Sequence, residues 1–230
     1  MFNLPSPSTL QSYTGRYTGS VGFGPLVKKR LELLASTLSP IEMIGSVSLD
    51  ESTIAPGEEY DRPQQLIGGV DMGGIVPNSK EGTDEAREAN KVLAFEFTGL
   101  TKHYKVPIAF YFVRELTAEE LLALLLEVIK QLEALGYKVF RVCTDNLSTN
   151  RKLFTLLNNG TLSHVVRHPV QSGATEEEIR DYGFRPLFLC FDYCHVLKNV
   201  KHQFFDRNFH INGEMVTAKF LKTIFQQQSG

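Results

Sequence analysis

The segment that most constrains the fold of this chain is a leucine-rich helix in its middle. Thr117-Ala118-Glu119-Glu120 has the order of a capping box, in which the threonine hydroxyl accepts from a first-turn amide and the second glutamate accepts from the cap amide. A leucine-rich run continues to Leu135, and Gly136 is placed to end the helix. This helix therefore separates an earlier part of the chain from a later part with a different pattern.

The earlier part is predicted to be mainly extended. Short runs rich in β-branched and aromatic residues alternate with polar or glycine-containing turns, which is typical of strands. The expected strands are Ile41–Leu49, Gln65–Val70, Lys91–Thr98 and Val106–Arg114. Residues 78–90 are polar and acidic, and they predict a surface loop or short helix. Consecutive strands of this kind favour an antiparallel arrangement.

In the later part, strands and helices alternate. The expected strands are Tyr137–Thr144, Ser163–Arg167 and Pro186–Phe191, and the expected helices are Arg151–Leu157, Thr175–Tyr182 and His195–Phe205. Such alternation favours parallel neighbours. Together the two parts predict an α/β fold with a mixed sheet covered by helices.

The two ends of the chain differ from this central pattern. Residues 1–40 predict a helical lead-in, with a helix start at Pro5-Ser6-Pro7-Ser8, a glycine-rich turn and a second helix from Pro25. Residues 206–230 predict a turn at Asn212-Gly213 and a helix over Val216–Phe225. We therefore divide the chain into residues 1–40, 41–205 and 206–230.

Composition excludes some classes of protein. The hydrophobic fraction of 42% is ordinary for a folded domain, and the net charge of −2 provides no general attraction to nucleic acid. Contacts with DNA must then be local. The three cysteines, Cys143, Cys190 and Cys194, predict buried reduced thiols in a reducing compartment. Neither a signal peptide nor an apolar run long enough for a bilayer is expected.

Two aspartates are the strongest candidates for chemistry. Asp50 and Asp145 each follow a β-branched run and precede polar residues, so each is expected at the end of a strand. If the strands are neighbours, the two carboxylates can share a divalent cation, because hard cations prefer oxygen ligands. Asp192 is a third acid at the end of the last strand. Aspartates at strand ends are also common turn residues, which leaves a purely structural role open.

Other site types find less support. Cys190, Cys194 and His195 offer soft metal ligands, and His164 with His168 offers a second pair, but the spacing does not match a structural zinc site. Cysteines packed in strands are the favoured interpretation. The triplet Lys28-Lys29-Arg30 suits either phosphate contacts or a solvated helix face, and the second is favoured. No glycine-rich phosphate loop or nucleophile elbow is present in the sequence.

A colinear series of short motifs extends over nearly the whole chain. It begins with Leu4-Pro5-Ser6 and Leu49-Asp50-Glu51-Ser52, continues through Val142-Cys143-Thr144-Asp145-Asn146 with Asn150, and ends with Phe191-Asp192-Tyr193-Cys194-His195-Val196-Leu197-Lys198-Asn199. In this series the chain resembles the RNase H-like catalytic region of P-element-type transposases, including those attached to THAP DNA-binding domains.

The resemblance implies a cut-and-paste DNA transposase located in the nucleus. Its Mg²⁺ or Mn²⁺ ions would be held by two aspartates and one glutamate, and Asp50 and Asp145 match the two aspartates. The glutamate and a GTP-binding insertion would lie further along the protein, so the RNase H-like fold is expected to be incomplete at the C-terminus, with the GTP site mostly outside this chain. Transposon-end DNA and further copies of the protein are the implied partners.

The motifs also depart from the family pattern. Ser52 stands where the family commonly has methionine, and Asp192-Tyr193-Cys194-His195 stands where it usually has prolines. Asp192, His195 and Lys198 remain candidates for supporting the metal ligands or contacting phosphate, and Lys201 is a further phosphate candidate. The alternatives are a domesticated, inactive DNA-associated interaction module and a nuclease of the same fold with different biology.

Overall fold

The computed structural model describes residues 20–55, 57, 59–60, 66–67, 69–75 and 88–228. The predicted helix start at Pro5–Ser8 and most of the predicted loop at residues 78–90 lie outside these residues. The chain divides into two compact units, Met1–Leu116 with Ala123–Val139 and Thr117–Leu122 with Phe140–Gly230. Each unit is described by itself below.

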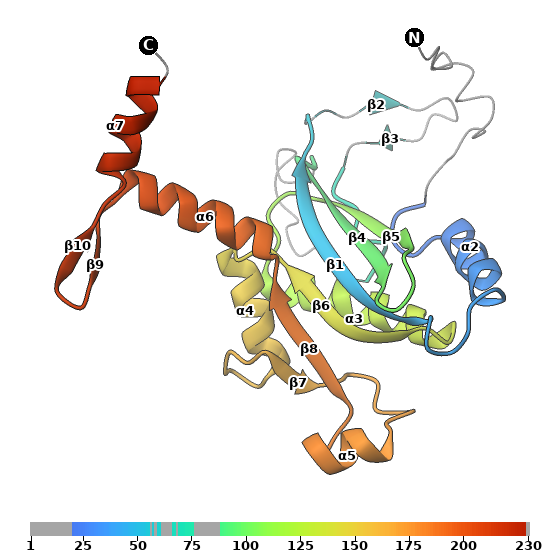
Figure 1. Cartoon of the computed structure of the whole chain (residues 1–230). Helices are drawn as coiled ribbons and strands as arrows, with labels where there is room; N and C mark the ends of the chain where they lie inside the picture. The colour runs from blue at the N-terminus through green and yellow to red at the C-terminus, as the bar shows by residue number, and fades with distance from the viewer. Residues whose placement is uncertain are drawn as a thin grey trace, which may run out of the picture. The chain divides into compact units, whose positions relative to one another are not determined.

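The first unit contains an antiparallel sheet in the order β5-β4-β1 (Figure 1). Its strands are β1 (Ile44–Thr53), β4 (Lys91–Gly99) and β5 (Lys105–Val113). Leu49 of β1 lies opposite Phe95 of β4, and the β4–β5 register shifts at Phe95/Glu96. The predicted antiparallel arrangement of the early strands is therefore confirmed.

Alternating residues of these strands form an apolar core. Leu93, Phe95 and Phe97 of β4 are buried, and the Phe95 ring meets that of Tyr111 edge-on at 5.9 Å between centroids. Helix α2 (Pro25–Ala35) contacts β5 and buries Leu31, whose carbonyl accepts a 2.8 Å hydrogen bond from the Tyr137 hydroxyl. Burial raises the pKa of both tyrosines to about 12. These contacts attach the lead-in helix to the sheet.

Among the described residues between β1 and β4, the regular structure consists of two short strands and two isolated bridges. Strands β2 (Glu59–Tyr60) and β3 (Leu66–Ile67) form a two-residue antiparallel pair. Of the predicted strand Gln65–Val70, Leu66 and Ile67 belong to β3 and Gly69 and Val70 do not, whereas Gln65 and Gly68 lie outside the described residues. Gly69 forms an isolated bridge with Glu88, and Asp71 forms one with Phe112. Asp71 also closes a turn, because its carboxylate accepts from the Gly73 amide at 2.9 Å.

Helix α3 (Ala118–Ala134) begins and ends as predicted. The Glu120 amide donates to the Thr117 hydroxyl at 3.2 Å, and the Thr117 amide donates to the Glu120 carboxylate at 2.8 Å. Gly136 follows the helix with a φ of 86°, a conformation that glycine adopts at low cost. The apolar stripe of the helix is buried: Leu121, Leu124, Leu125, Val128, Ile129 and Leu132. The capping box and the leucine pattern are both confirmed.

The second unit contains β6 (Lys138–Thr144) from Phe140 onward, β8 (Pro186–Phe191) and β7 (Val165–Arg167), in the order β6-β8-β7. Strands β6 and β8 are parallel, as the strand-helix alternation predicts, with Val142 opposite Leu189. The helices are α4 (Ser148–Leu157), α5 (Glu176–Tyr182) and α6 (Tyr193–Asp206). Helix α5 has its own capping box at Thr175 and Glu178. Because parallel and antiparallel strand pairs both occur, the strand arrangement is mixed.

Strand β7 is antiparallel to β8, so the expectation of parallel neighbours is wrong at this strand. The connection from β7 to β8 brings the start of β8 beside the end of β7. His168, directly after β7, donates its amide to the carbonyl of Arg185, directly before β8, at 2.9 Å. The buried Arg185 guanidinium donates to the carbonyls of Val170 and Ser172 at 3.0 and 3.1 Å. The connection therefore behaves as a long hairpin that contains α5.

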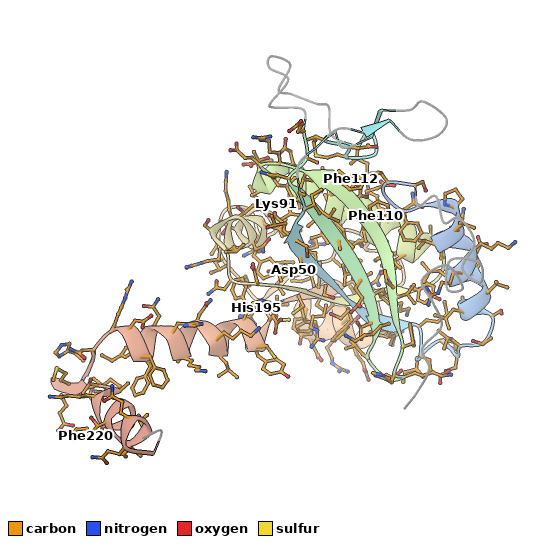
Figure 2. The ribbon with its side chains drawn as sticks, turned by 90° about the horizontal axis from the view of Figure 1, so that it is seen from above. Asp50, Lys91, Phe110, Phe112, His195 and Phe220 are labelled. Atoms are coloured by element: carbon orange, nitrogen blue, oxygen red, sulfur yellow. The ribbon has the colours of Figure 1, made fainter. Side chains whose placement is uncertain are left out.

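After β8 the structure is largely exposed. Helix α6 buries none of its residues. Cys194 at its start is exposed, and Cys143 and Cys190 are half-buried, which corrects the prediction of three buried thiols. The hairpin of β9 (Phe209–Ile211) and β10 (Glu214–Val216) confirms the turn at Asn212-Gly213. Helix α7 (Lys219–Gln228) begins later than predicted because Val216 belongs to β10. Figure 2 shows Phe220 on this last helix.

None of the helices in the described residues combines the length and the apolar composition that crossing a membrane would require.

Candidate functional site

Asp50 lies inside β1 and not at its end, which corrects the sequence prediction. The strand continues to Thr53, and Asp50 lies opposite Ala94 of β4. The reason is that β4 supplies backbone partners for the polar residues after Leu49, and a ladder of this kind extends a strand beyond its apolar run. Local polarity therefore marked the end of the buried segment and not the end of the strand.

The Asp50 side chain is exposed on its strand. Alternation of side chains puts Ser48, Asp50 and Ser52 on the face opposite the buried Val47 and Leu49. Asp50 Oδ1 accepts a 2.9 Å hydrogen bond from the backbone N–H of Glu51, and Oδ2 accepts none from the residues that the structure describes. Figure 2 shows Asp50 on β1, which lies beside β4, the strand that carries Lys91.

The neighbouring acid Glu51 has a different role. Its carboxylate forms an ion pair with Lys91 of β4, with 2.7 Å between Oε2 and Nζ. This pair connects two adjacent strands of the sheet. Asp50 has no such cationic partner in the described part of the chain, so its charge is available for another ligand.

Asp145 directly follows β6 and precedes α4. Its Oδ1 accepts two hydrogen bonds, one from the Leu147 backbone N–H at 3.1 Å and one from Asn150 Nδ2 at 2.6 Å. Among the described residues, no donor reaches Oδ2. The preceding Thr144 is buried and donates its hydroxyl to the Asp145 carbonyl at 2.8 Å. The backbone and one carboxylate oxygen of Asp145 are thus both held in place.

Asp192 directly follows β8 and is the N-cap of α6. Its Oδ1 accepts from the Cys194 backbone N–H at 2.8 Å, and its Oδ2 lies 2.9 Å from His195 Nδ1. The hydrogen bond from the Cys194 amide is the main cause that holds the pKa of the Asp192 carboxyl below its ordinary value of 3.8, and the interaction with His195 is the second cause. Both carboxylate oxygens therefore have partners within the helix.

The second unit brings Asp145, Asp192 and His195 to the same sheet edge. Thr144 lies opposite Phe191 in the parallel β6–β8 pair, and the Asp192 amide donates to the Thr144 carbonyl at 2.7 Å. The carboxyl ends of adjacent parallel strands meet at one edge, which is where ligands bind in many α/β proteins. Lys198 and Lys201 lie further along α6 and are exposed. Asp50 belongs to the first unit.

The donor chemistry of Asp50 and Asp145 fits a hard divalent cation. Each offers an anionic oxygen that has no hydrogen-bond donor in the described part of the chain, and Mg²⁺ and Mn²⁺ prefer such oxygens. Across residues 20–55, 69–75, 88–228 and the short described pieces between them, however, no three or more His, Cys, Asp or Glu side chains are grouped to hold a metal.

The zinc alternative gains no support from the described residues. His168 is buried, and its Nδ1 interacts with the backbone of Val170 at 2.8–2.9 Å. Cys190 lies opposite Cys143 in the parallel pair, where burial and the neighbouring thiol raise the Cys143 pKa to about 12.

Sequence reasoning missed the contact between Asn150 and Asp145. Asn150 was noted only as part of a motif, although its position five residues after Asp145 could have indicated the contact. A helix that starts at Ser148 places the residue at position 150 in its first turn, close to the strand end that precedes it. The helix was instead predicted to start at Arg151, which left Asn150 in the loop.

Comparisons with known proteins agree with this architecture. A family model described as "TNP-like, RNase H N-terminal domain" matches residues 19–158. Among curated proteins no match is found. The structure is similar to the Drosophila P element transposase strand transfer complex, with a TM-score of 0.67 and 21% identity over 97% of this chain and 43% of that chain. The likeness confirms the RNase H-like α/β fold with a mixed sheet and flanking helices.

Two further solved structures are much less similar. The Mos1 strand transfer complex has a TM-score of 0.25 and 14% identity, over 86% of this chain and 61% of that one. The Mos1 mariner paired end complex with Mn has a TM-score of 0.23 and 15% identity, over 96% and 61%. Neither value supports an inference about this chain.

Proposed function

Because the chain belongs to the family of TNP-like RNase H N-terminal domains, we propose that it is the catalytic region of a P-element-like DNA transposase. The family match covers residues 19–158, and the fold likeness extends over 97% of the chain. The chain spans 43% of the length of the transposase that it resembles. The proposed reaction therefore belongs to a longer protein, of which this chain supplies two catalytic acids.

The residues that carry the proposal are Asp50 and Asp145. Both occupy the positions that the resemblance implies for metal-binding aspartates, and each has one carboxylate oxygen without a donor among the described residues. Two Mg²⁺ or Mn²⁺ ions, about 4 Å apart in enzymes of this kind, would stabilise the entering and leaving oxygens of a phosphodiester displacement. The third carboxylate, a glutamate, and the GTP site are assigned to other parts of the protein.

Local features of the second unit suit contact with DNA. Lys198 and Lys201 are exposed on α6, and the described helix contains no acidic residue before Asp206. Lysines of this kind contact phosphates and position a protein on DNA without reading its sequence. We assign transposon-end DNA as the substrate, further copies of the same protein as partners, and the nucleus as the location. Asp192 and His195 support this edge by fixing the start of α6.

The test is a strand-cleavage assay on a longer protein that contains this chain. Asp145→Ala should abolish Mn²⁺-dependent cleavage of transposon-end DNA, because the remaining acids cannot replace its charge. Asp181→Asn is a suitable control, since Asp181 is an exposed residue of α5 that forms an ion pair with the adjacent Arg180. Undiminished cleavage by Asp145→Ala would sink the assignment.

A second candidate function is an inactive interaction module that retains the fold. The observation in its favour is that the Asp145 contacts also suit a turn residue at the start of α4. Metal binding to the native state raises thermal stability by mass action. A melting-temperature increase with Mn²⁺ that is lost in Asp50→Ala and Asp145→Ala supports the transposase. No increase at millimolar Mn²⁺ favours the inactive module.

A further inference from the structure

The starting observation is the unequal use of the two Asp145 oxygens. Oδ1 accepts hydrogen bonds from both the Leu147 amide and the Asn150 side chain, whereas Oδ2 accepts none from the described residues. A turn that starts at an aspartate needs only one such bond, from the amide two residues later. The Leu147 bond already satisfies that requirement. The Asn150 bond is therefore more than the turn needs.

Asn150 is itself a buried polar side chain. It is 8% exposed and lies in the first turn of α4, between the exposed helix start and the buried Leu153 and Phe154. Burying an amide group without a hydrogen bond is unfavourable, so its position depends on a partner. Asp145 Oδ1, at 2.6 Å from Nδ2, is that partner. The contact orients the carboxylate and the amide together.

Asp192 shows that this arrangement is not general for strand-end aspartates in the chain. It closes a similar turn with the Cys194 amide, but its second partner, His195, lies at the other oxygen. Both Asp192 oxygens are therefore occupied. At Asp145 the two donors converge on one oxygen and leave the other available.

We propose that Asn150 is a positioning residue that holds Asp145 by Oδ1, so that Oδ2 serves as the oxygen ligand for a divalent cation. The proposal rests on the proposed function, because it gives Asp145 its metal. Residues that hydrogen-bond metal ligands restrict ligand orientation, and their removal typically lowers metal affinity roughly 10–100-fold. Asn150 needs no contact with metal or DNA to have this effect.

The test measures Mn²⁺ binding to the 230-residue chain by electron paramagnetic resonance of the free ion. We expect Asn150→Ala to weaken the Asp145-dependent binding by about 10–100-fold. Leu153→Ala is the matched control, because it removes a fully buried side chain from the same helix without touching the Asn150–Asp145 hydrogen bond. It should lower the melting temperature more than Asn150→Ala does, yet retain the wild-type Mn²⁺ affinity below that temperature.

Asp145→Ala separates this inference from the proposed function. If Asp145→Ala loses Mn²⁺ binding while Asn150→Ala binds as tightly as the wild type, positioning by Asn150 is overturned and the metal role of Asp145 stands. If Asp145→Ala and the wild type bind Mn²⁺ equally, or neither binds it, the metal role is overturned and the positioning proposal with it. Equal weakening by Leu153→Ala and Asn150→Ala would also overturn positioning, because general destabilisation would then explain both.

Discussion

The second unit contains two strand-to-helix connections that begin alike and end differently. In each, a parallel strand is followed directly by an aspartate that accepts from the amide two residues later, at Asp145–Leu147 and at Asp192–Cys194. After β6, helix α4 buries Asn150, Leu153 and Phe154. After β8, helix α6 buries none of its residues. Equivalent positions at one sheet edge thus carry a packed helix in one case and an exposed helix in the other.

The difference shows that the second hydrogen-bond partner of a carboxylate determines whether one of its oxygens remains available for a ligand. Asn150 is buried with its helix and shares one oxygen of Asp145 with Leu147. His195 is on an exposed helix and takes the second oxygen of Asp192. Asp145 is consequently held through one oxygen and has the other available, whereas Asp192 stabilises the start of α6. The next four experiments test this comparison.

The largest expected effect concerns packing under α4. Phe154 is 2% exposed, and its ring stacks on Phe191 with 5.1 Å between centroids. Phe154→Ala should lower the free energy of unfolding by about 3–5 kcal/mol through lost burial and the resulting cavity. Urea unfolding measures the change. Leu197→Ala on α6, at a residue that is 61% exposed, should change it by less than about 0.5 kcal/mol. Similar losses for both variants would break the comparison.

A smaller effect is expected at the cap of α6. Asp192→Ala removes the acceptor for the Cys194 amide and should cost about 1 kcal/mol of unfolding free energy. Asp192→Ser should recover most of this loss, because serine is also a good N-cap. Chemical unfolding followed by circular dichroism compares the three proteins. An unchanged stability in Asp192→Ala would show that the exposed helix does not need its cap.

The same residue gives a pH dependence with a defined sign. The Cys194 and His195 contacts lower the pKa of Asp192 in the folded state below its ordinary 3.8. The resulting stabilisation is present above that ordinary value and is lost as the pH falls through the lower folded pKa. The stability difference between the wild type and Asp192→Asn should therefore shrink below about pH 4. Unfolding curves at a series of acidic pH values measure it, and a constant difference contradicts the assignment.

The smallest expected effect is chemical and leaves the fold intact. Cys194 is exposed on α6, whereas burial, with the nearby Cys190 as a further cause, raises the Cys143 pKa to about 12. Since the thiolate is the reactive form, iodoacetamide at mildly alkaline pH should modify Cys194 at least about tenfold faster than Cys143. Peptide mass spectrometry over time gives both rates. Comparable rates would mean that the end of β6 is as open as the start of α6.

Elements with a local cause were predictable from the sequence. The capping box at Thr117 and Glu120, the glycine stop at Gly136 and the turn at Asn212-Gly213 are each formed by residues close together in the chain. The alternating strands β4 and β5 and the apolar strand β8 were also found at nearly their true bounds. In these segments the side-chain pattern and the backbone hydrogen bonds favour the same structure, so little depends on distant partners.

Features that depend on a distant partner were not predictable in the same way. Asp50 was expected after β1, but pairing with β4 extends the strand to Thr53. Helix α4 was expected at Arg151, but it begins at Ser148, directly after a turn in which the Asp145 carboxylate accepts from the Leu147 amide. The antiparallel direction of β7 depends on a connection that the buried Arg185 holds in place.

The sequence by itself determined the mixed strand-helix order and the two aspartates as the candidate acids, because periodicity and local capping depend on neighbouring residues. Only the tertiary structure decided how each acid is used. It placed Asp50 within a strand, gave Asp145 a buried Asn150 partner on one oxygen, and occupied both oxygens of Asp192. The physical reason is that the availability of a carboxylate depends on which donors the folded chain brings to it, and short sequence patterns do not specify those donors.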